Sequence, residues 1–413
     1  MTGKECEVEI LRGFKDILPD NIDKWQFLET TARNTIESFG FREIRTPILE
    51  KTQLFKRSVG ETTDIVEKEM YTFLDKNNES ITMRPEGTAG VVRAYIDNHL
   101  ELSSFKKYYY IGPMFRYERP QKGRLRQFHQ IGIEVFGIDE PAIDAEVVYI
   151  NKALLNNLGI NNVRIEINNI GCDMCRPNYM DALKSYFEEY RSQLCEDCQK
   201  RLYRNPLRIL DCKNEHCRLI AKGAPKITSF ACETCRSHYD VVKEKLTDFG
   251  VDFIENPMLV RGLDYYTKFV FEIITDKLGA QGTVSAGGRY DNLVEQLGGK
   301  STSGVGFAAG EERLIELIED YPKNRIDFYI ANLDVDEYAV QIANKLRGIG
   351  KKVYVEYERR SLKSMMKRAN RMNAEFAVII GENEKNNRKV MVKNLFESKQ
   401  SEYSLEAFLD EVK

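Results

Sequence analysis

The segment from Tyr108 to Gly137 carries the densest set of side chains that could do chemistry. It reads as two antiparallel strands joined by a loop rich in Arg, Lys, Gln and Gly. A strand alternates its side chains between two faces. The second strand therefore presents Ile131, Ile133 and Val135 on one face and Gln130, Gly132 and Glu134 on the other.

The polar face of this second strand is typical of the floor of a binding site. Gly132 leaves room for a ligand over the sheet, and the Glu134 carboxylate could accept hydrogen bonds from an imidazole or an ammonium group. Arg116, near the end of the first strand, could clamp a phosphate or a carboxylate with its planar guanidinium. From spacing alone, an ordinary amphipathic hairpin with one solvated face explains the alternation equally well.

Eight of the nine cysteines lie between residues 172 and 235. Three pairs have CxxC spacing and a further pair encloses His216; the eight are Cys172, Cys175, Cys195, Cys198, Cys212, Cys217, Cys232 and Cys235. This spacing favours tetrahedral thiolate coordination of a structural zinc, and eight thiols suffice for two sites. The alternative is that the thiols stay reduced and pack inside an inserted domain.

A strongly basic stretch lies near the C-terminus, where residues 345–371 hold ten Lys or Arg against two Glu. Such a local excess indicates a polyanionic partner such as a nucleic acid. A solvated helix face is the alternative.

These groups need elements of more than one kind to position them. Residues 1–168 mix a helix over 21–38 with strands over 107–117 and 128–137, which predicts an α+β unit on an antiparallel sheet. Residues 169–245 form a Cys-rich insertion, and residues 246–322 resume the first unit. Residues 326–413 alternate strands with helices over 336–346 and 362–372, which predicts a small, largely parallel α/β domain.

Length and composition limit the number of domains and the class of protein. The chain has 413 residues, 42% of them apolar and 30% charged, and a formal net charge of -3. This length favours more than one domain, and the charge neither requires nor excludes a nucleic-acid partner. No apolar run approaches the roughly 20 residues that cross a bilayer, and the N-terminus lacks a signal-peptide core. We therefore expect a cytoplasmic protein with no membrane partner.

Five segments in order resemble the signature sequences of histidyl-tRNA synthetases, a family of class II aminoacyl-tRNA synthetases. FRYERPQKGRLRQFHQIGIEVFG (115–137) resembles the second class II motif in its histidine-specific form. FGFREIRTPILE (39–50) and GVGFAAGEERL (304–314) are similar to the first and third motifs. MRPEGT (83–88) and LVRGLDYYTKFVFE (259–272) are similar to segments characteristic of the histidine enzymes. One departure is Glu311, at a position where we expect an apolar or small residue.

The resemblance implies an activity, a set of partners and a role for each site residue. The protein would activate L-histidine with ATP and Mg²⁺ and transfer it to tRNA(His), as a homodimer joined through the first motif. Its catalytic domain would be split by the Cys-rich insertion, and residues 326–413 would bind the anticodon. The implied sites are Arg116 and Arg313 for ATP, Arg261 for the reacting carboxylate and α-phosphate, Glu86, Thr88 and Gln130 for the amino group, Glu134, Tyr265 and Tyr266 for the imidazole, and Arg119 and Gln121 for the tRNA acceptor end.

Two other classes of protein share some of these features. A regulatory paralogue would bind histidine without charging tRNA, but it would be expected to lose the ATP-binding arginines and the C-terminal domain. A zinc-ribbon nucleic-acid-binding module would explain the cysteines and the basic stretch. It would leave the carboxylate and arginines of the predicted floor unexplained.

Overall fold

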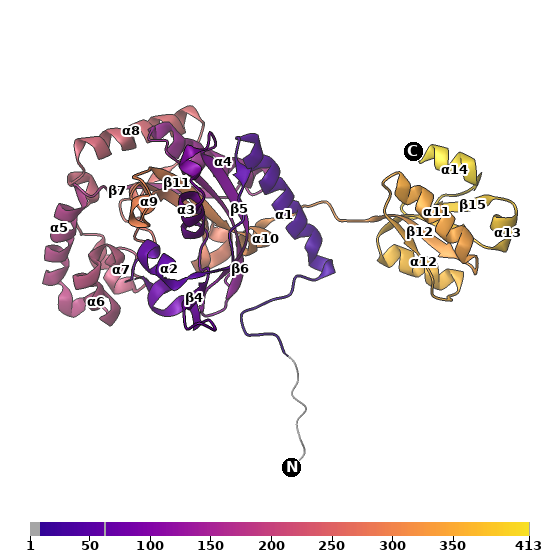
Figure 1. Cartoon of the computed structure of the whole chain (residues 1–413), viewed down its shortest axis with the longest axis horizontal. Coiled ribbons are helices and arrows are strands. Elements are labelled where there is room, and N and C mark those ends of the chain that lie inside the picture. Colours follow the sequence, from indigo (N-terminus) through magenta and orange to yellow (C-terminus); the bar gives the residue numbers. More distant parts are fainter. Residues whose placement is uncertain (1–8, 62, 413) are drawn as a thin grey trace, which may run out of the picture. The chain divides into compact units, whose positions relative to one another are not determined.

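The computed structural model describes residues 9–61 and 63–412, and the chain divides into two compact units, Met1–Tyr321 and Pro322–Lys413. Each unit is built around its own sheet (Figure 1). Among the described residues, no helix is long and apolar enough to cross a membrane.

The first unit is organised by an eight-stranded sheet. Its strands, in spatial order, are β1 (Arg42–Glu43), β5 (Lys107–Phe115), β6 (Gln127–Phe136), β11 (Gly304–Gly310), β10 (Thr283–Arg289), β9 (Thr267–Ile274), β7 (Arg164–Gly171) and β8 (Ile254–Glu255). The six inner strands pair antiparallel, and the short edge strands β1 and β8 pair parallel to their neighbours. The predicted α+β unit on an antiparallel sheet is therefore confirmed.

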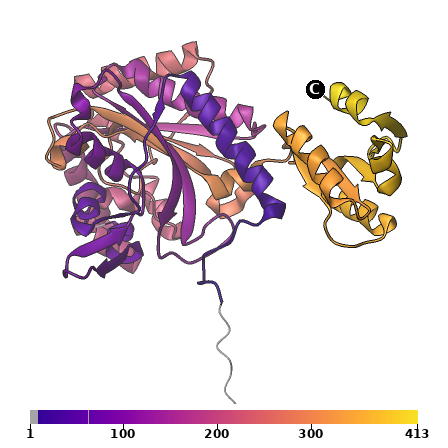
Figure 2. The same ribbon diagram turned by 45° about the vertical axis from the view of Figure 1, so that its right-hand side comes forward.

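One face of this sheet is buried under helices α1 (Pro19–Ser38), α4 (Pro141–Asn157) and α8 (Glu233–Asp248). Figure 2 shows α1, in indigo, crossing this face. Proline occupies the first turn of α1, and Leu28, Ala32 and Ile36 recur every four residues along its buried side. The residues that β6 contributes to this core are Ile131, Ile133 and Val135, as the period of two predicts.

The opposite face of the sheet carries the side chains that could do chemistry. It is flanked by α2 (Thr52–Val59), α3 (Thr88–Asp97), α9 (Leu293–Gln296) and a small sheet of β2 (Leu49–Lys51), β4 (Ser80–Met83) and β3 (Tyr71–Leu74). A second apolar cluster on this side joins α3 and α9 to tyrosines of β5 and of residues 265–290. Helix α10 (Glu311–Leu317) follows β11 and packs against α1.

The Cys-rich segment folds as helices within the first unit. These are α5 (Arg176–Glu189), α6 (Glu196–Arg204) and α7 (Glu215–Ala221), after which α8 returns to the sheet. Arg201 and Arg204 of α6 form ion pairs with Asp64 and Glu67, at 3.3 and 3.0 Å. The short helix η4 (Pro206–Ile209) leads back toward the sheet.

Close approach between strands explains the glycines of β10. A Cβ placed on Gly287 would lie 2.1 Å from the carbonyl oxygen of Gly306 on β11, so only glycine fits. Two residues further on, Arg289 is fully buried and forms an ion pair with the equally buried Asp144 of α4, at 2.6 Å. This pair ties the helical layer to the strand that leads to Tyr290.

The second unit holds a five-stranded sheet in the order β13 (Val353–Val355), β12 (Ile326–Asn332), β14 (Ala374–Ile380), β15 (Lys389–Asn394) and β16 (Gln400–Ser404). Its helices are α11 (Asp336–Gly348), α12 (Leu362–Arg371), α13 (Glu382–Asn386) and α14 (Leu405–Glu411). The prediction of a largely parallel sheet is only half right: β12 pairs parallel with β13 and β14, but β14, β15 and β16 pair antiparallel. The short connections between these strands allow a hairpin but not a parallel crossover.

Glu311, the departure noted in the third motif, is fully buried at the start of α10. Within the described part of the chain, both of its carboxylate oxygens lack a hydrogen-bond partner. Burial, together with the nearby Glu29 and Glu312 carboxylates, raises the pKa of Glu311 well above its usual value. The fold therefore carries a desolvated carboxyl that has no hydrogen bond among the described residues.

We expect Glu311→Met to stabilise the protein, since it removes an unsatisfied buried group while keeping the side-chain volume. The gain should be about 1–3 kcal/mol in the free energy of unfolding at pH 8. A raised folded-state pKa means that the stability from Glu311 is present below its unfolded pKa and is lost as pH rises, so the gain should shrink toward pH 5.

Urea unfolding at the two pH values measures this gain, with the exposed Glu316→Met on the same helix as control. A variant no more stable than the control at pH 8 would contradict the account.

Candidate active site

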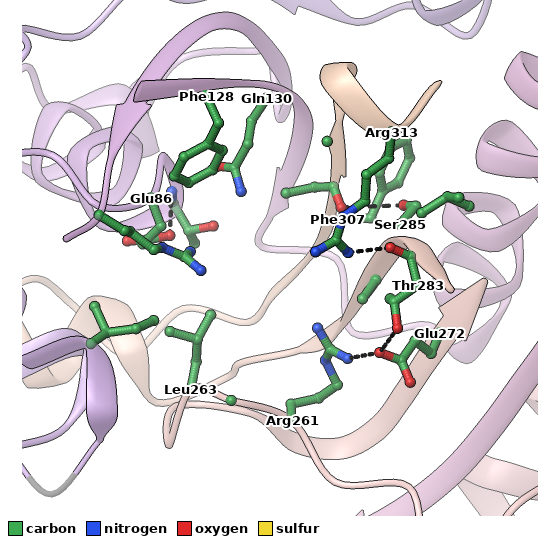
Figure 3. A pocket seen from close by; sticks show the side chains of 18 of the residues that line it. Glu86, Phe128, Gln130, Arg261, Leu263, Glu272, Thr283, Ser285, Phe307 and Arg313 are labelled. Atoms are coloured by element: carbon green, nitrogen blue, oxygen red, sulfur yellow. Dashed lines mark hydrogen bonds and ion pairs between the residues drawn. The ribbon is translucent and has the colours of Figure 1, made fainter. Parts of the chain in front are cut away.

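A cavity of about 450 Å³ lies over the polar face of the sheet, between β6, β10, β11 and the segments 83–88, 116–125 and 261–266. Nine of the residues that the resemblance singled out line it: Glu86, Thr88, Arg116, Gln130, Glu134, Arg261, Tyr265, Tyr266 and Arg313. They come from five segments far apart in the sequence. Figure 3 shows Arg261 and Arg313 reaching into the cavity from one side, with Glu86 and Gln130 on the other.

Glu134 sits at the bottom of the cavity with 1% of its surface exposed. Thr88 donates its hydroxyl to Glu134 Oε1 at 2.6 Å, and the Tyr290 hydroxyl donates to Oε2. Burial, reinforced by the Glu86 carboxylate, raises the pKa of Glu134 to about 8 against the opposing effect of these two hydrogen bonds. A donor group arriving from a ligand would favour the ionised carboxylate.

Glu86 is the second buried carboxyl of the cavity. It accepts the backbone N–H groups of Thr88 and Ala89, each at 2.8 Å, at the start of α3. Burial nevertheless raises the pKa of Glu86. Nearby, the Gln130 Oε1 atom is buried and lacks a hydrogen-bond partner among the described residues. This part of the cavity offers acceptors for a group with several N–H donors.

Glycines create the space for these side chains. A Cβ on Gly306 of β11 would lie 2.2 Å from Glu134 Oε2, so glycine is needed for that carboxyl to lie flat on the sheet. The prediction that Gly132 leaves room for a ligand is wrong. A Cβ there would meet the ring of Tyr110, its cross-strand partner on β5, at 2.2 Å. The missing side chain makes room for a tyrosine and not for a ligand.

Three arginines face the same cavity. Arg116 Nε donates to the Pro85 carbonyl at 2.8 Å, and Arg261 forms a 2.7 Å ion pair with Glu272 of β9. Arg313 donates to the Thr283 carbonyl of β10. Burial lowers the pKa of Arg116 and of Arg313, although a guanidinium stays charged at neutral pH. Burial lowers the pKa of Arg261, but the attraction of Glu272, Tyr266 and Asp211 together with the hydrogen bond to Glu272 leaves that pKa raised.

This arrangement suits a ligand that has donors at one end and negative charge at the other. Glu134, Glu86 and Gln130 can accept hydrogen bonds, while fixed guanidiniums can hold phosphate and carboxylate oxygens. Guanidiniums held by fixed partners need little reorganisation to stabilise charge that develops during a reaction. The geometry favours group transfer at a phosphorus or carbonyl centre.

Several lining residues were not found from the sequence: Glu118, Asp211, Lys213, Glu272, Thr283 and Tyr290. The sequence did contain a feature that could have indicated Tyr290, because this residue lies shortly after the glycine pair of β10. Asp211 and Lys213 flank Cys212 in the insertion, and nothing in their local sequence links them to the sheet.

Two predicted site residues lie elsewhere. Arg119 and Gln121 are exposed on the loop between β5 and β6 and are not among the residues that line the cavity. His129, on the other face of β6, is 2.9 Å from Glu312 and packs edge-on against Trp25, so it is a pairing residue. In the second unit, most of the ten basic residues of 345–371 are exposed.

The eight cysteines form two groups of four. The first cluster is Cys172, Cys175, Cys232 and Cys235, and the second cluster is Cys195, Cys198, Cys212 and Cys217. Within each cluster the four sulfur atoms lie within 4.8 Å of one another, and all eight thiols are free. His216 is exposed and takes no part.

Comparisons with known proteins show the family of the chain. A family model described as histidyl-tRNA synthetase matches residues 13–173 and 213–314, and a model described as anticodon binding domain matches residues 326–413. Histidine--tRNA ligase of Halothermothrix orenii is 48% identical, over 98% of this chain and 99% of that protein. The same enzyme of Caldanaerobacter subterraneus subsp. tengcongensis is also 48% identical, over 95% of this chain and 96% of that protein.

The solved structures extend the likeness to three dimensions. Apo histidyl-tRNA synthetase of S. aureus matches with a TM-score of 0.83 and 38% identity, over 98% of this chain and 99% of that chain. The class II synthetase architecture, with a Cys-rich insertion and a C-terminal α/β domain, thus agrees with the sequence-based expectation. The chain belongs to the histidyl-tRNA synthetase family.

Proposed function

We propose that this protein is a histidine–tRNA ligase, which activates L-histidine with ATP and transfers it to the 3′ end of tRNA(His). One observation carries the proposal: a single cavity joins the buried Glu134 and Glu86 carboxyls to three fixed arginines. Likeness to histidine--tRNA ligases over nearly the full length supports it. The retained arginines and C-terminal unit argue against a regulatory paralogue.

The chemistry needs alignment more than covalent help. In the first step a histidine carboxylate oxygen attacks the α-phosphorus of ATP, the bond to the bridging oxygen breaks, and pyrophosphate leaves. In the second step a terminal ribose hydroxyl of the tRNA attacks the carbonyl carbon, loses its proton, and AMP leaves. Fixed positive charge stabilises both transition states. No side-chain nucleophile is required.

The family resemblance and the position of each residue in the cavity suggest its role. Arg116 and Arg313 bind the phosphates and adenine of ATP, and Arg261 contacts the reacting carboxylate and the α-phosphate. The amino group of histidine is received by Glu86, Thr88 and Gln130, and the imidazole by Glu134, Tyr265 and Tyr266. Tyr290 orients the Glu134 carboxylate through its hydroxyl. A site built to pair both ring nitrogens rejects amino acids that lack them.

Mg²⁺ is expected to bind to the protein as a complex with ATP. Among the described residues, the groups of His, Cys, Asp and Glu side chains that could hold a metal ion are the two cysteine clusters. The ATP phosphates would therefore supply most of the Mg²⁺ ligands. Glu118 and Glu272 are carboxylates of the cavity that could add to them.

The tRNA needs two contact surfaces. Arg119 and Gln121 lie on an exposed loop beside the cavity mouth and would read the acceptor end. Residues 326–413 would bind the anticodon, with the basic residues of 345–371 on the phosphates. The catalytic domain would comprise residues 1–168 and 246–322, interrupted by the insertion 169–245. We also expect a homodimer joined through residues 39–50, working in the cytoplasm where tRNA is charged.

Each cysteine cluster is proposed to bind a structural zinc ion. A tetrahedral site with Zn–S bonds of roughly 2.3 Å has sulfur–sulfur edges of about 3.8 Å. The closest sulfur pairs of the first cluster are 3.7 and 3.8 Å apart, and Cys195 and Cys212 of the second are 3.8 Å apart. These distances are too long for disulfides, whose sulfurs are about 2.05 Å apart.

Zinc content tests this directly. The purified protein should carry about two zinc ions per chain, one for each four-thiolate cluster. Cys232→Ser and Cys217→Ser should each remove about one of them. Mass spectrometry of metals measures the content, and protein free of zinc after purification with added zinc would contradict the assignment.

Arg261→Ala should abolish formation of histidyl-adenylate while the protein stays folded, because the reacting carboxylate and phosphate lose their shared cation. Exchange of labelled pyrophosphate into ATP measures activation, and circular dichroism checks the fold. The exposed Arg218→Ala is a matched control on the insertion. Near-normal exchange in Arg261→Ala would remove this residue from its role. Histidine binding without any exchange in the wild type would favour the regulatory paralogue.

Glu134→Gln should raise the KM for histidine about 10- to 100-fold, as expected when a buried charged acceptor is lost. It should also change the pH dependence of stability in the ligand-free protein. Because the folded pKa of about 8 lies above the ordinary 4.5, the stability from Glu134 is present below pH 4.5 and is lost as pH rises through 8.

Urea unfolding at several pH values should therefore show a smaller loss of stability between pH 5 and 8 in the Gln variant than in the wild type. Equal losses in both proteins would show that Glu134 is ionised throughout this range.

A further inference from the structure

Residues 261–266 form an irregular loop, called here the 261–266 loop, that carries Arg261, Tyr265 and Tyr266. It contains no helix or strand, so its backbone groups have no regular ladder to fix them. The backbone N–H of Asp264 donates to the Val59 carbonyl at 3.2 Å, and Tyr265 and Tyr266 pack in a buried apolar cluster. The placement of the three proposed substrate-binding side chains therefore rests on contacts made with other segments.

Both ends of the loop are held by arginines of the insertion. Arg208 donates from its two terminal nitrogens to the carbonyl of Arg261, at 2.8 Å, and to that of Gly262, at 3.2 Å. Arg176 donates to the carbonyl of Tyr266 at 2.6 Å. Hydrogen bonds from a charged donor are the stronger kind, and a forked donor also fixes direction.

Each of these arginines lies close along the chain to a different cysteine cluster. Arg176 follows Cys175 directly, and its backbone N–H donates to the Cys172 carbonyl at 2.8 Å. Arg208 lies in η4, and the backbone N–H of Cys212 donates to the Ile209 carbonyl at the end of that helix, at 3.1 Å.

Residues next to the second cluster in the sequence also line the cavity. Cys212 is buried in the cluster, while Asp211 and Lys213 on either side of it line the cavity. A shift of Cys212 would therefore move a wall of the cavity together with Arg208.

We propose that the two thiolate metal sites hold Arg176 and Arg208 in place, and that these arginines position the 261–266 loop for binding histidine and ATP. The metals would thus control activation without contacting a substrate. This inference rests on the proposed ligase function and on the proposed zinc sites. Arg176 and Arg208 are positioning residues, because they act through the loop and contact no reacting atom.

The test compares Arg176→Ala and Arg208→Ala with Arg236→Ala. Arg236 follows Cys235 as Arg176 follows Cys175, but it is exposed and its ion pair, at 3.4 Å, is with Glu233 of its own helix. We expect both test variants to raise the KM for histidine in pyrophosphate exchange at least tenfold, since small displacements of aligned groups cost up to about 100-fold. Arg236→Ala should match the wild type.

Hydrogen exchange of the backbone amides in residues 261–266 gives a readout independent of activity. Exchange should accelerate in Arg176→Ala and Arg208→Ala while zinc content stays at the wild-type value. Arg208→Lys, which keeps the charge but loses the fork, should fall between alanine and wild type. If Arg208→Ala does not fold, Arg208→Lys replaces it as the test variant.

Removing the metal with a strong chelator tests the link to the clusters. The 261–266 loop should lose protection and histidine activation should fall at least tenfold, while the strands of the eight-stranded sheet stay protected. Added zinc should restore both.

Loop protection and KM equal to those of Arg236→Ala in both arginine variants would overturn the positioning role. Unchanged loop protection in metal-free protein would overturn the metal link. A wild-type protein without histidine-dependent pyrophosphate exchange would refute the ligase function instead. Hydrogen exchange in the 261–266 loop would still test whether Arg176 and Arg208 hold the loop.

Discussion

Burying carboxyls inside an apolar fold is the constraint on which the rest of this structure depends. Glu134 is 1% exposed on a central strand, and Glu86 lies buried beside it. Two such groups destabilise one another unless donors and cations surround them. Thr88 and Tyr290, through hydrogen bonds to Glu134, and Arg116, through its charge near Glu86, supply part of that compensation. A ligand that donates hydrogen bonds to these carboxyls would compensate their burial further. The ligand-free fold therefore favours binding of such a ligand.

Two features of the local sequence allow polar side chains to be buried at the cavity floor. The alternation of β6 sends isoleucine and valine into the helical layer and leaves the polar side chains on the cavity floor. Glycines on the neighbouring strands then admit bulky groups at short range: Gly306 admits the Glu134 carboxyl, and Gly304 admits the ring of Tyr290. The buried pair of Asp144 and Arg289 fixes β10 to the layer beneath. A rigid floor follows, and only the loops above it need outside support.

Sequence reasoning succeeded where local pattern decides the outcome, and it was wrong or silent where contacts between distant segments decide it. The faces of β6, the helix α1 and the strand pairing of β5 with β6 follow from period and composition. The ring of Tyr110 over Gly132 depends on cross-strand register, which the sequence does not give. Likewise, CxxC spacing indicates thiolate sites, but only the fold shows that Cys172 and Cys175 join Cys232 and Cys235. The place of Asp211 and Lys213 at the cavity depends on how the insertion folds back onto the sheet.

The central claim is that one cavity places the imidazole of histidine on Glu134 and its carboxylate on Arg261. A crystal structure of the protein with L-histidine and a non-hydrolysable ATP analogue measures this most directly. We expect the imidazole ring within hydrogen-bond distance of Glu134 and the carboxylate facing Arg261, with the phosphates beside Arg116. An imidazole ring bound away from Glu134, or a carboxylate facing away from Arg261, would contradict it.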